Sequence, residues 1–160
     1  MPTISIQQDD PAEAADLIAQ LDAYHTNLYP AESNHLLSLD ALRQPNVMFL
    51  IARVDGEIAG CGAFVARGDW AELKRMFVVP KFRGQKLGKR LLDELETRMR
   101  LAGVALARLE TGIAQAEALG LYLKAGYVRR GPFGEYVDDA LSVFMEKGLP
   151  LSVCSSDRKP

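Results

Sequence analysis

The sequence is short of the residues that build disulfide frameworks and metal sites. Its 160 residues include two cysteines, Cys61 and Cys154, and two histidines, His25 and His35. Cys61 lies in a strand-like run and Cys154 in a polar tail, so we expect no disulfide framework. No Cys/His cluster has zinc spacing, so we expect no metal site, and both histidines are expected to be structural or exposed to solvent.

Long apolar runs and an excess of one charge are also missing. No stretch of about 18 apolar residues could span a membrane. Residues 1–10 are polar and lack the basic start and apolar core of a signal peptide. The net charge is −2, which argues against a partner such as nucleic acid. We therefore expect a cytoplasmic protein that works neither on membranes nor on nucleic acid.

The composition is that of an ordinary globular protein, with 48% hydrophobic and 25% charged residues. A chain of this length suits a single buried core, and no repeat or linker divides it. We expect one domain over residues 1–149 and a disordered polar tail over 150–160.

Hydrophobic periodicity predicts a mixed α/β (α+β) fold. Strand patterns cover residues 3–7, 47–54, 57–65, 70–79, 105–110, 127–130 and 141–147, and helical patterns cover 11–28, 39–43, 86–102 and 115–125. Asp55-Gly56 is typical of a tight hairpin turn. This order predicts a twisted sheet of about six or seven strands, an antiparallel meander passing into a parallel crossover unit, with about four helices.

The helix predicted over 86–102 is strongly amphipathic, and Gly103 is expected to end it. Its apolar face carries Leu87, Leu91, Leu92, Leu95 and Met99. Its charged side chains are expected to face outward: Lys89, Arg90, Asp93, Glu96 and Arg100.

The segment before this helix combines glycine with positive charge. A strand ends near Val79, a loop contains Gly84, and the helix containing Gly88 begins within the loop. Backbone N–H groups at such a helix start lack helical partners, and the helix dipole favours an anion there. Basic side chains lie nearby: Lys81, Arg83, Lys86, Lys89 and Arg90. A pyrophosphate group would suit this loop.

The glycine spacing differs from that of nucleotide-binding loops. Three residues separate Gly84 from Gly88, whereas the triphosphate-binding loop has four, followed by Lys and Ser/Thr. Arg90 stands where the magnesium-binding hydroxyl should be, and the three-glycine dinucleotide pattern is absent. On spacing alone, Gly88 could equally be a packing glycine and the basic residues a solvated helix start.

The same run resembles the acetyl-CoA signature of the GNAT superfamily of N-acetyltransferases, Arg/Gln-x-x-Gly-x-Gly/Ala. Arg83 and Gly88 fit its ends, and Lys86 replaces its middle glycine. Residues 115–127 are similar to the family's second diagnostic block. There Gln115 replaces the usual Asn, and the matching residues are Ala118, Tyr122, Lys124, Gly126 and Tyr127. The resemblance covers about residues 47–147.

The resemblance implies transfer of an acetyl group from acetyl-CoA to a primary amine by direct attack in a ternary complex, without a metal. It implies that the Met76 N–H contacts the thioester oxygen, that Val78 contacts the pantetheine arm, and that residues 83–88 hold the pyrophosphate with Lys89 nearby. The implied cofactor-binding set is Met76, Phe77, Val78, Arg83, Gly84, Gln85, Lys86, Leu87, Gly88, Lys89, Gln115 and Tyr122.

Tyr122 is the candidate general acid. A phenol with a pKa near 10 stays protonated at neutral pH and can donate a proton to the departing thiolate. The alternative is that the Tyr122 ring only packs under the cofactor.

Glu72 is the candidate general base. Unless a bulge intervenes, strand alternation places four side chains on one face: Glu72, Lys74, Met76 and Val78. The alternative is an exposed carboxylate paired with Lys74 or Arg75. Glu110, on the next predicted strand, is a second candidate.

The resemblance implies an acceptor pocket lined by residues 24–39 and 131–140. These segments contain acidic Glu32, Glu135, Asp138 and Asp139 and aromatic Tyr29, Phe133 and Tyr136. Such a lining would suit a small cationic amine. A non-catalytic acyl-CoA-binding module and an acetyltransferase for a protein lysine or N-terminus stay open. Nucleic-acid binding by basic residues within 74–100 is disfavoured, because Asp93, Glu94 and Glu96 interrupt that patch. A homodimer is compatible with the sequence.

Overall fold

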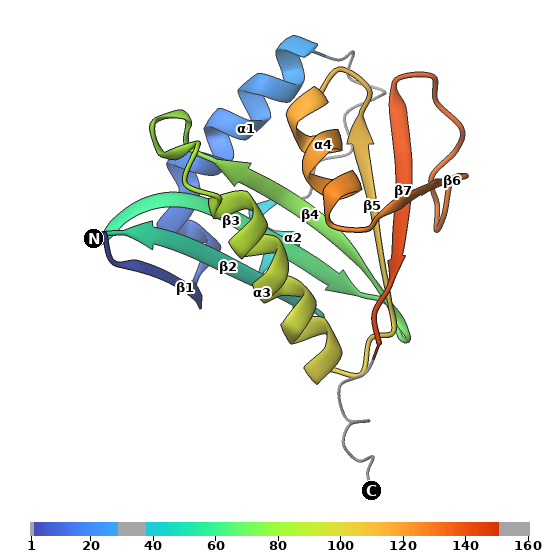
Figure 1. Cartoon of the computed structure of the whole chain (residues 1–160), viewed down its shortest axis with the longest axis horizontal. Helices are drawn as coiled ribbons and strands as arrows, with labels where there is room; N and C mark the ends of the chain where they lie inside the picture. The colour runs from blue at the N-terminus through green and yellow to red at the C-terminus, as the bar shows by residue number, and fades with distance from the viewer. Residues whose placement is uncertain (1, 29–37, 151–160) are drawn as a thin grey trace, which may run out of the picture.

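The computed structural model describes the backbone of residues 2–28 and 38–150 and the side chains of residues 2–23 and 38–150. The predictions for the tail, for the acceptor segment 29–37 and for the side chains of His25, His35 and Cys154 lie outside these ranges. Seven strands form one sheet in the order β1-β2-β3-β4-β5-β7-β6 (Figure 1). The strands are β1 (Ile4–Gln8), β2 (Val47–Val54), β3 (Glu57–Ala66), β4 (Trp70–Val78), β5 (Leu106–Gly112), β6 (Val128–Arg130) and β7 (Ser142–Gly148).

Strand direction follows the predicted meander. Neighbouring strands pair antiparallel, except that β4 and β5 are parallel. Asp55 and Gly56, with φ of 50° and 85°, make the β2–β3 turn, and a turn with two such positive values fits the twist of a hairpin. The mixed α/β sheet predicted from periodicity is thus confirmed.

Helices cover both faces of the sheet. α3 and α4 pack on one face with residues of β2–β5 and β7, and α1 and α2 pack on the other (Figure 1). We call these the α3 face and the α1 face. The helical elements are η1 (Pro11–Ala14), α1 (Ala15–Leu28), α2 (Leu39–Leu42), η3 (Pro80–Phe82), α3 (Leu87–Leu101) and α4 (Ala116–Lys124). In the described residues, no helix has the length and apolar character needed to cross a membrane.

The predicted apolar face of α3 is confirmed. Its five apolar side chains are at most 1% exposed, and burying each one stabilises the fold by about 1.5–3 kcal/mol. The prediction that Glu96 faces outward is wrong, because its carboxylate is 3% exposed. Tyr127 and Lys147 reach it with hydrogen bonds of 2.8 Å each, which offsets the cost of burying its charge.

A bulge in β4 overturns the expected alternation. Arg75 has φ of 59°, and the register against β3 shifts between the Lys74 and Phe77 pairs. Lys74 is paired with Ala63 of the α1-face core, whereas Met76 packs against the α3-face core. Glu72 therefore lies on the opposite face from Met76, and the prediction that they share a face is wrong. The extra residue reverses which face each later side chain occupies.

Candidate active site

The sheet opens between β4 and β5. Their parallel pairing covers Trp70–Leu73 against Leu106–Leu109, but β4 continues to Val78 and β5 to Gly112. Figure 1 shows the two arrows diverging, with α4 lying over the gap. We call this opening the β4–β5 splay. Backbone groups that would pair inside a closed sheet face an open edge here.

The backbone of Met76 and Val78 is directed toward this splay. The Val79 N–H donates to the Ala59 carbonyl of β3 at 2.8 Å. Because successive residues of a strand point their N–H groups to opposite edges, those of Val78 and Met76 point away from β3. The side chain of Phe77 packs with the α1-face core instead. Of the three predicted contact residues on β4, Met76 and Val78 thus offer backbone N–H groups at the splay, whereas the backbone of Phe77 faces β3.

The loop before α3 forms an uncapped helix start. Gly84 has φ of 90°, and Lys86, the N-cap of α3, has φ of 62° and makes no side-chain capping bond. The first intrahelical bond runs from the Arg90 N–H to the Lys86 carbonyl, at 3.1 Å. The N–H groups of Leu87, Gly88 and Lys89 precede it and have no helical acceptor. The uncapped helix start predicted from the sequence is present, and anion binding there stays a prediction.

The side chains of this loop divide between surface and core. Arg83, Gln85, Lys86 and Lys89 are exposed, whereas Leu87 is buried and can offer only its backbone. Arg83 Nε donates to the Val78 carbonyl at 3.2 Å, which folds this cation back toward the splay.

Two of these cations have carboxylate neighbours. Arg83 Nη1 lies 3.7 Å from Glu117, and Lys89 Nζ lies 2.7 Å from Asp93. The hydrogen bond from Lys89 to Asp93 raises the pKa of the Lys89 amine. Both pairs are exposed, so a bound anion could compete for either cation at little cost.

Gly88 brings three elements together at the end of the splay. A Cβ there would lie 3.3 Å from a Leu121 methyl of α4 and 4.0 Å from a Val78 methyl of β4. The absence of a side chain therefore lets the start of α3 approach α4 and β4 closely. The packing role considered for Gly88 is present together with the uncapped helix start.

Tyr122 projects from α4 into the α3-face core beside the splay. Its side chain is 5% exposed, and its hydroxyl has no hydrogen-bond partner among the described residues. Burial raises the pKa of this phenol above its ordinary value of 10.0, so the group stays protonated. A buried hydroxyl without a partner is costly, and a bound ligand that accepted its proton would remove that cost.

Gln115 joins β5 to α4. Its Oε1 accepts from the Gly112 N–H at 2.8 Å and from Thr111 Oγ1 at 3.3 Å. These bonds tie Gln115, the residue before α4, to the end of β5, and its predicted contact with the cofactor stays a prediction.

Glu72 lies in a polar cluster on the α1 face. It is 4% exposed, its Oε2 lies 3.2 Å from Lys74 Nζ, and it accepts a hydrogen bond from the Tyr136 hydroxyl. Lys74 Nζ also lies 2.5 Å from that hydroxyl. Burial, followed by the Glu72 charge, raises the pKa of Tyr136. The pairing of Glu72 with Lys74 is as considered from the sequence, but the carboxylate is buried, and Arg75 pairs with Asp22 of α1 instead.

The loop between β6 and β7 contributes aromatic side chains to this cluster. The Phe133 ring lies 5.1 Å from that of Tyr136, and Tyr136 lies 5.4 Å from Phe144 of β7. Ser142 Oγ donates to Glu110 at 2.7 Å, which adds a second carboxylate on the same face. Of the predicted acidic residues, Glu135 and Asp138 are exposed, and Asp139 accepts from the Leu141 N–H within the loop.

Sequence patterns do not predict several of these contacts. The Arg75–Asp22 pair depends on a bulge at a residue type that seldom adopts positive φ. The buried Glu96 network joins residues far apart in the chain. Tyr127, however, was part of the matched block, and a Gly-Tyr pair after a helix is a recognisable C-terminal signal.

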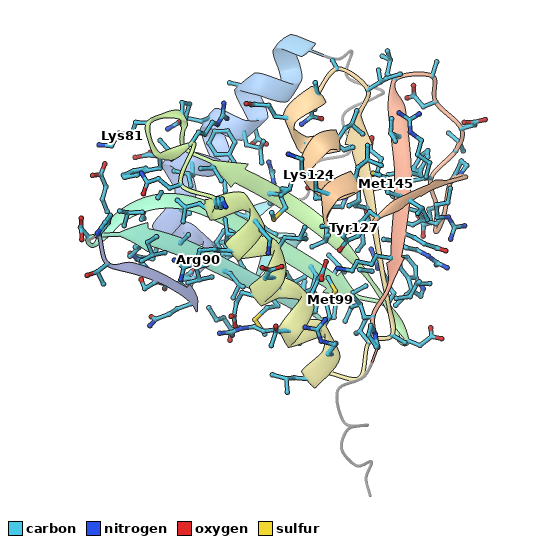
Figure 2. The ribbon with its side chains drawn as sticks, viewed as in Figure 1. Lys81, Arg90, Met99, Lys124, Tyr127 and Met145 are labelled. Atoms are coloured by element: carbon cyan, nitrogen blue, oxygen red, sulfur yellow. The ribbon has the colours of Figure 1, made fainter. Side chains whose placement is uncertain are left out.

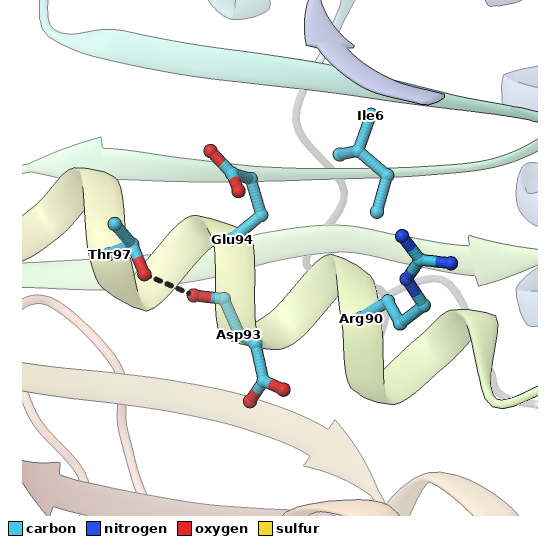
Figure 3. Close-up of a pocket in the computed structure, with 5 residues that line it drawn as sticks. All are labelled: Ile6, Arg90, Asp93, Glu94 and Thr97. Carbon is cyan, nitrogen blue, oxygen red and sulfur yellow. Dashed lines mark hydrogen bonds between the residues drawn. The ribbon is translucent and has the colours of Figure 1, made fainter. Parts of the chain in front are cut away.

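A shallow groove of about 380 Å³ lies elsewhere, between β1 and the outer side of α3 (Figure 3). Its lining residues are Ile6, Arg90, Asp93, Glu94 and Thr97. None of them belongs to the splay or the Glu72 cluster. Within the part of the chain that the structure describes, no three His, Cys, Asp or Glu side chains are grouped closely enough to hold a metal ion.

Comparison of the sequence with known proteins gives consistent matches. The family model described as "Acetyltransferase (GNAT) family" matches residues 14–127. An IAA acetyltransferase from Azospirillum brasilense is 48% identical over 93% of this chain and 100% of its own length. The uncharacterized N-acetyltransferase YsnE of Bacillus subtilis is 35% identical over 78% of this chain and 84% of its own. An aminoalkylphosphonate N-acetyltransferase of Salmonella typhimurium is 35% identical over 54% and 60%.

Solved structures share the fold. A Klebsiella pneumoniae protein assigned as an acyl-CoA N-acyltransferase has a TM-score of 0.76 and 40% identity, and the match covers 93% of this chain and 98% of that one. The PaiA N-acetyltransferase of Thermoplasma acidophilum, crystallised with coenzyme A, has a TM-score of 0.70 and 20% identity over 91% and 98%.

Proposed function

The chain belongs to the acetyltransferase (GNAT) family and is an acetyl-CoA-dependent N-acetyltransferase, and we propose that it acetylates the primary amine of a small molecule within a ternary complex. One observation carries the proposal. The β4–β5 splay opens beside an uncapped helix start at one end. At its side lies the buried Tyr122 hydroxyl, which has no hydrogen-bond partner among the described residues. Along the splay, this arrangement offers an anion site, then an open strand edge with backbone groups, and then a proton donor.

Acetyl-CoA fits the residues along this path. The N–H groups at the start of α3 and the cations of Arg83 and Lys89 would hold the pyrophosphate. The backbone of Val78 would pair with the pantetheine arm as a missing strand does. The Met76 N–H would stabilise the oxyanion that develops on the thioester oxygen. Acetyl-CoA supplies the activated acyl group.

Tyr122 is proposed as the general acid. As the new N–C bond forms and the C–S bond breaks, the thiolate needs a proton, and the Tyr122 hydroxyl is protonated, buried and without a competing acceptor among the described residues.

Glu72 is proposed as the general base, acting through Tyr136. The Tyr136 hydroxyl already donates to Glu72, so it can pass its own proton to the carboxylate while it takes one from the attacking amine. Tyr122 lies on the α3 face and Glu72 on the α1 face. The amine could then approach from one side of the sheet while the thiolate is protonated on the other.

The α1-face cluster favours a small cationic amine as the acceptor. Glu72 and Glu110 supply carboxylates, and Tyr136, Phe133 and Phe144 supply aromatic rings. The Salmonella relative carries the name of a small amine acceptor, an aminoalkylphosphonate, which supports this class. A cytoplasmic location and a homodimer both stay predictions.

Two measurements test the proposal in order. Calorimetric titration should give micromolar binding of acetyl-CoA and none of ATP. A thiol-release screen of small amines should then give turnover that Tyr122→Phe lowers by on the order of 10²-fold while acetyl-CoA affinity is retained. Glu72→Gln should lower turnover in the same assay. Absence of acetyl-CoA binding at millimolar ligand, or full turnover by Tyr122→Phe, would contradict the assigned roles.

A further inference from the structure

The C-terminal end of α4 fixes one tyrosine beside another. The Gly126 N–H donates to the Leu123 carbonyl at 3.1 Å, and the Tyr127 N–H donates to the Tyr122 carbonyl at 3.0 Å. Gly126 has φ of 100°. These are the two bonds of a Schellman motif, which commonly brings the residue after the glycine against the one five positions earlier. The rings of Tyr122 and Tyr127 accordingly meet edge to face, with centroids 5.7 Å apart.

The far end of Tyr127 is held by a buried charge. Its hydroxyl donates to Glu96 Oε2 of α3 at 2.8 Å, and Lys147 Nζ of β7 donates to Glu96 Oε1 at 2.8 Å. Tyr127 is 1% and Glu96 is 3% exposed. Figure 2 shows Tyr127 where the end of α4 meets α3 and β7. The ring that touches Tyr122 is therefore tied to α3 and, through Glu96, to β7.

Stability alone explains this network poorly. Removing a carboxylate from water costs several kcal/mol, and replacing a buried ion pair with well-packed apolar side chains is often neutral or stabilising. The Tyr122 hydroxyl, in contrast, has no bond of its own among the described residues, so its orientation depends on packing. The Tyr127 ring packs against Tyr122, and the hydrogen bond from the Tyr127 hydroxyl to Glu96 in turn holds that ring in place.

We propose that Glu96, supported by Lys147, positions the catalytic Tyr122 through the hydroxyl and ring of Tyr127. Glu96 and Tyr127 are positioning residues, since neither touches the reacting atoms. The inference rests on the proposed role of Tyr122 as general acid. Misplacing a reacting group by about 1 Å can lower the rate on the order of 10²-fold, so loss of the anchor should act on kcat and spare cofactor binding.

A double-mutant cycle tests this coupling. Tyr127→Phe keeps the ring and removes the bond to Glu96, so kcat should fall on the order of 10-fold while the acetyl-CoA Kd stays within about 2-fold. In the Tyr122→Phe background, Tyr127→Phe should produce no further loss of kcat. Calorimetric stoichiometry gives the folded, binding-competent fraction of each variant. An equal loss of kcat in both backgrounds would overturn the proposal.

A second pair of variants keeps the test independent of one substitution. Glu96→Gln retains a hydrogen-bonding partner for the Tyr127 hydroxyl, whereas Glu96→Leu removes it. We expect Glu96→Gln to keep most of the kcat per binding-competent molecule and Glu96→Leu to lose about as much as Tyr127→Phe. Equal kcat values in these two variants would overturn the inference. If Tyr122→Phe itself leaves kcat unchanged, the assignment of Tyr122 as the acid fails. If Tyr122→Phe lowers kcat but Tyr127→Phe lowers it equally in both backgrounds, only the positioning role fails.

Discussion

Leu73 of β4 and Leu109 of β5 form the last parallel pair between these two strands, and both side chains are buried on the α3 face. The bulge at Arg75 follows directly. A bulge increases local twist and bends its strand, so it accounts for the divergence of β4 from β5 at this point. The splay is therefore built into the backbone of β4 and is ready before any ligand binds.

Close backbone packing behind the splay should be intolerant of one added methyl group. A Cβ on Gly60 of β3 would lie 2.8 Å from the Phe77 carbonyl oxygen. That atom belongs to β4 between Met76 and Val78 and cannot rotate away. We expect Gly60→Ala to lower the free energy of unfolding by about 1–3 kcal/mol and to weaken acetyl-CoA binding, as measured by denaturant unfolding and calorimetry.

The matched control is the same change in α4. A Cβ on Gly120 would meet no atom within 4 Å, and its φ is not positive. Alanine favours a helix over glycine by about 1 kcal/mol, so Gly120→Ala should stabilise the fold. Similar changes in the free energy of unfolding for the two substitutions would show that the contact with the Phe77 carbonyl does not destabilise Gly60→Ala.

The loop before α3 carries removable strain. Lys86 has φ of 62°, a conformation that costs a side-chain-bearing residue about 1–2 kcal/mol, and it occupies the position of the signature's middle glycine. Lys86→Gly should raise the free energy of unfolding by about 0.5–1 kcal/mol after the entropy cost of glycine. Arg90→Gly, inside α3, should lower it by about 1 kcal/mol. Equal losses in both variants would contradict the strain at Lys86.

Stability at acid pH should depend on Glu146. Its Oε1 lies 2.6 Å from Arg130 Nη1 and 3.1 Å from Arg108 Nε. The hydrogen bond from Arg130 is the largest cause that lowers its pKa below the ordinary 4.5. A carboxylate with a lowered folded pKa stabilises the fold above the ordinary value and loses that contribution as pH falls through the folded one. Urea unfolding curves of wild type and Glu146→Gln should therefore differ at pH 7 and converge below pH 4.5. If the free energies of unfolding of the two proteins differed by the same amount over this whole range, the ionised Glu146 would not be what stabilises the fold.

Local patterns predicted most of the elements because each is determined by nearby residues. The apolar stripe of α3 and the Asp55-Gly56 turn lie where periodicity and turn chemistry place them. The prediction that Glu72 shares a face with Met76 is wrong because the bulge lies at Arg75. An arginine at that position does not indicate a positive φ. Glu96 was misplaced because its partners come from β7 and from the end of α4, so no helical pattern could reveal them.

The pH dependence of turnover should reveal the state of Tyr122. A general acid supports catalysis only while it is protonated, so an ordinary phenol would cause turnover to decline as pH approaches about 10. Burial raises the Tyr122 pKa above that value, so kcat at saturating amine should show no descending limb from Tyr122 between pH 7 and about pH 10. Thiol release from wild type and Tyr122→Phe, measured over this range, checks the expectation. A descending limb near pH 9 in wild type that disappears in Tyr122→Phe would mean that Tyr122 ionises more easily than its burial implies. A limb present in both proteins would belong to another group, and the raised pKa would stand.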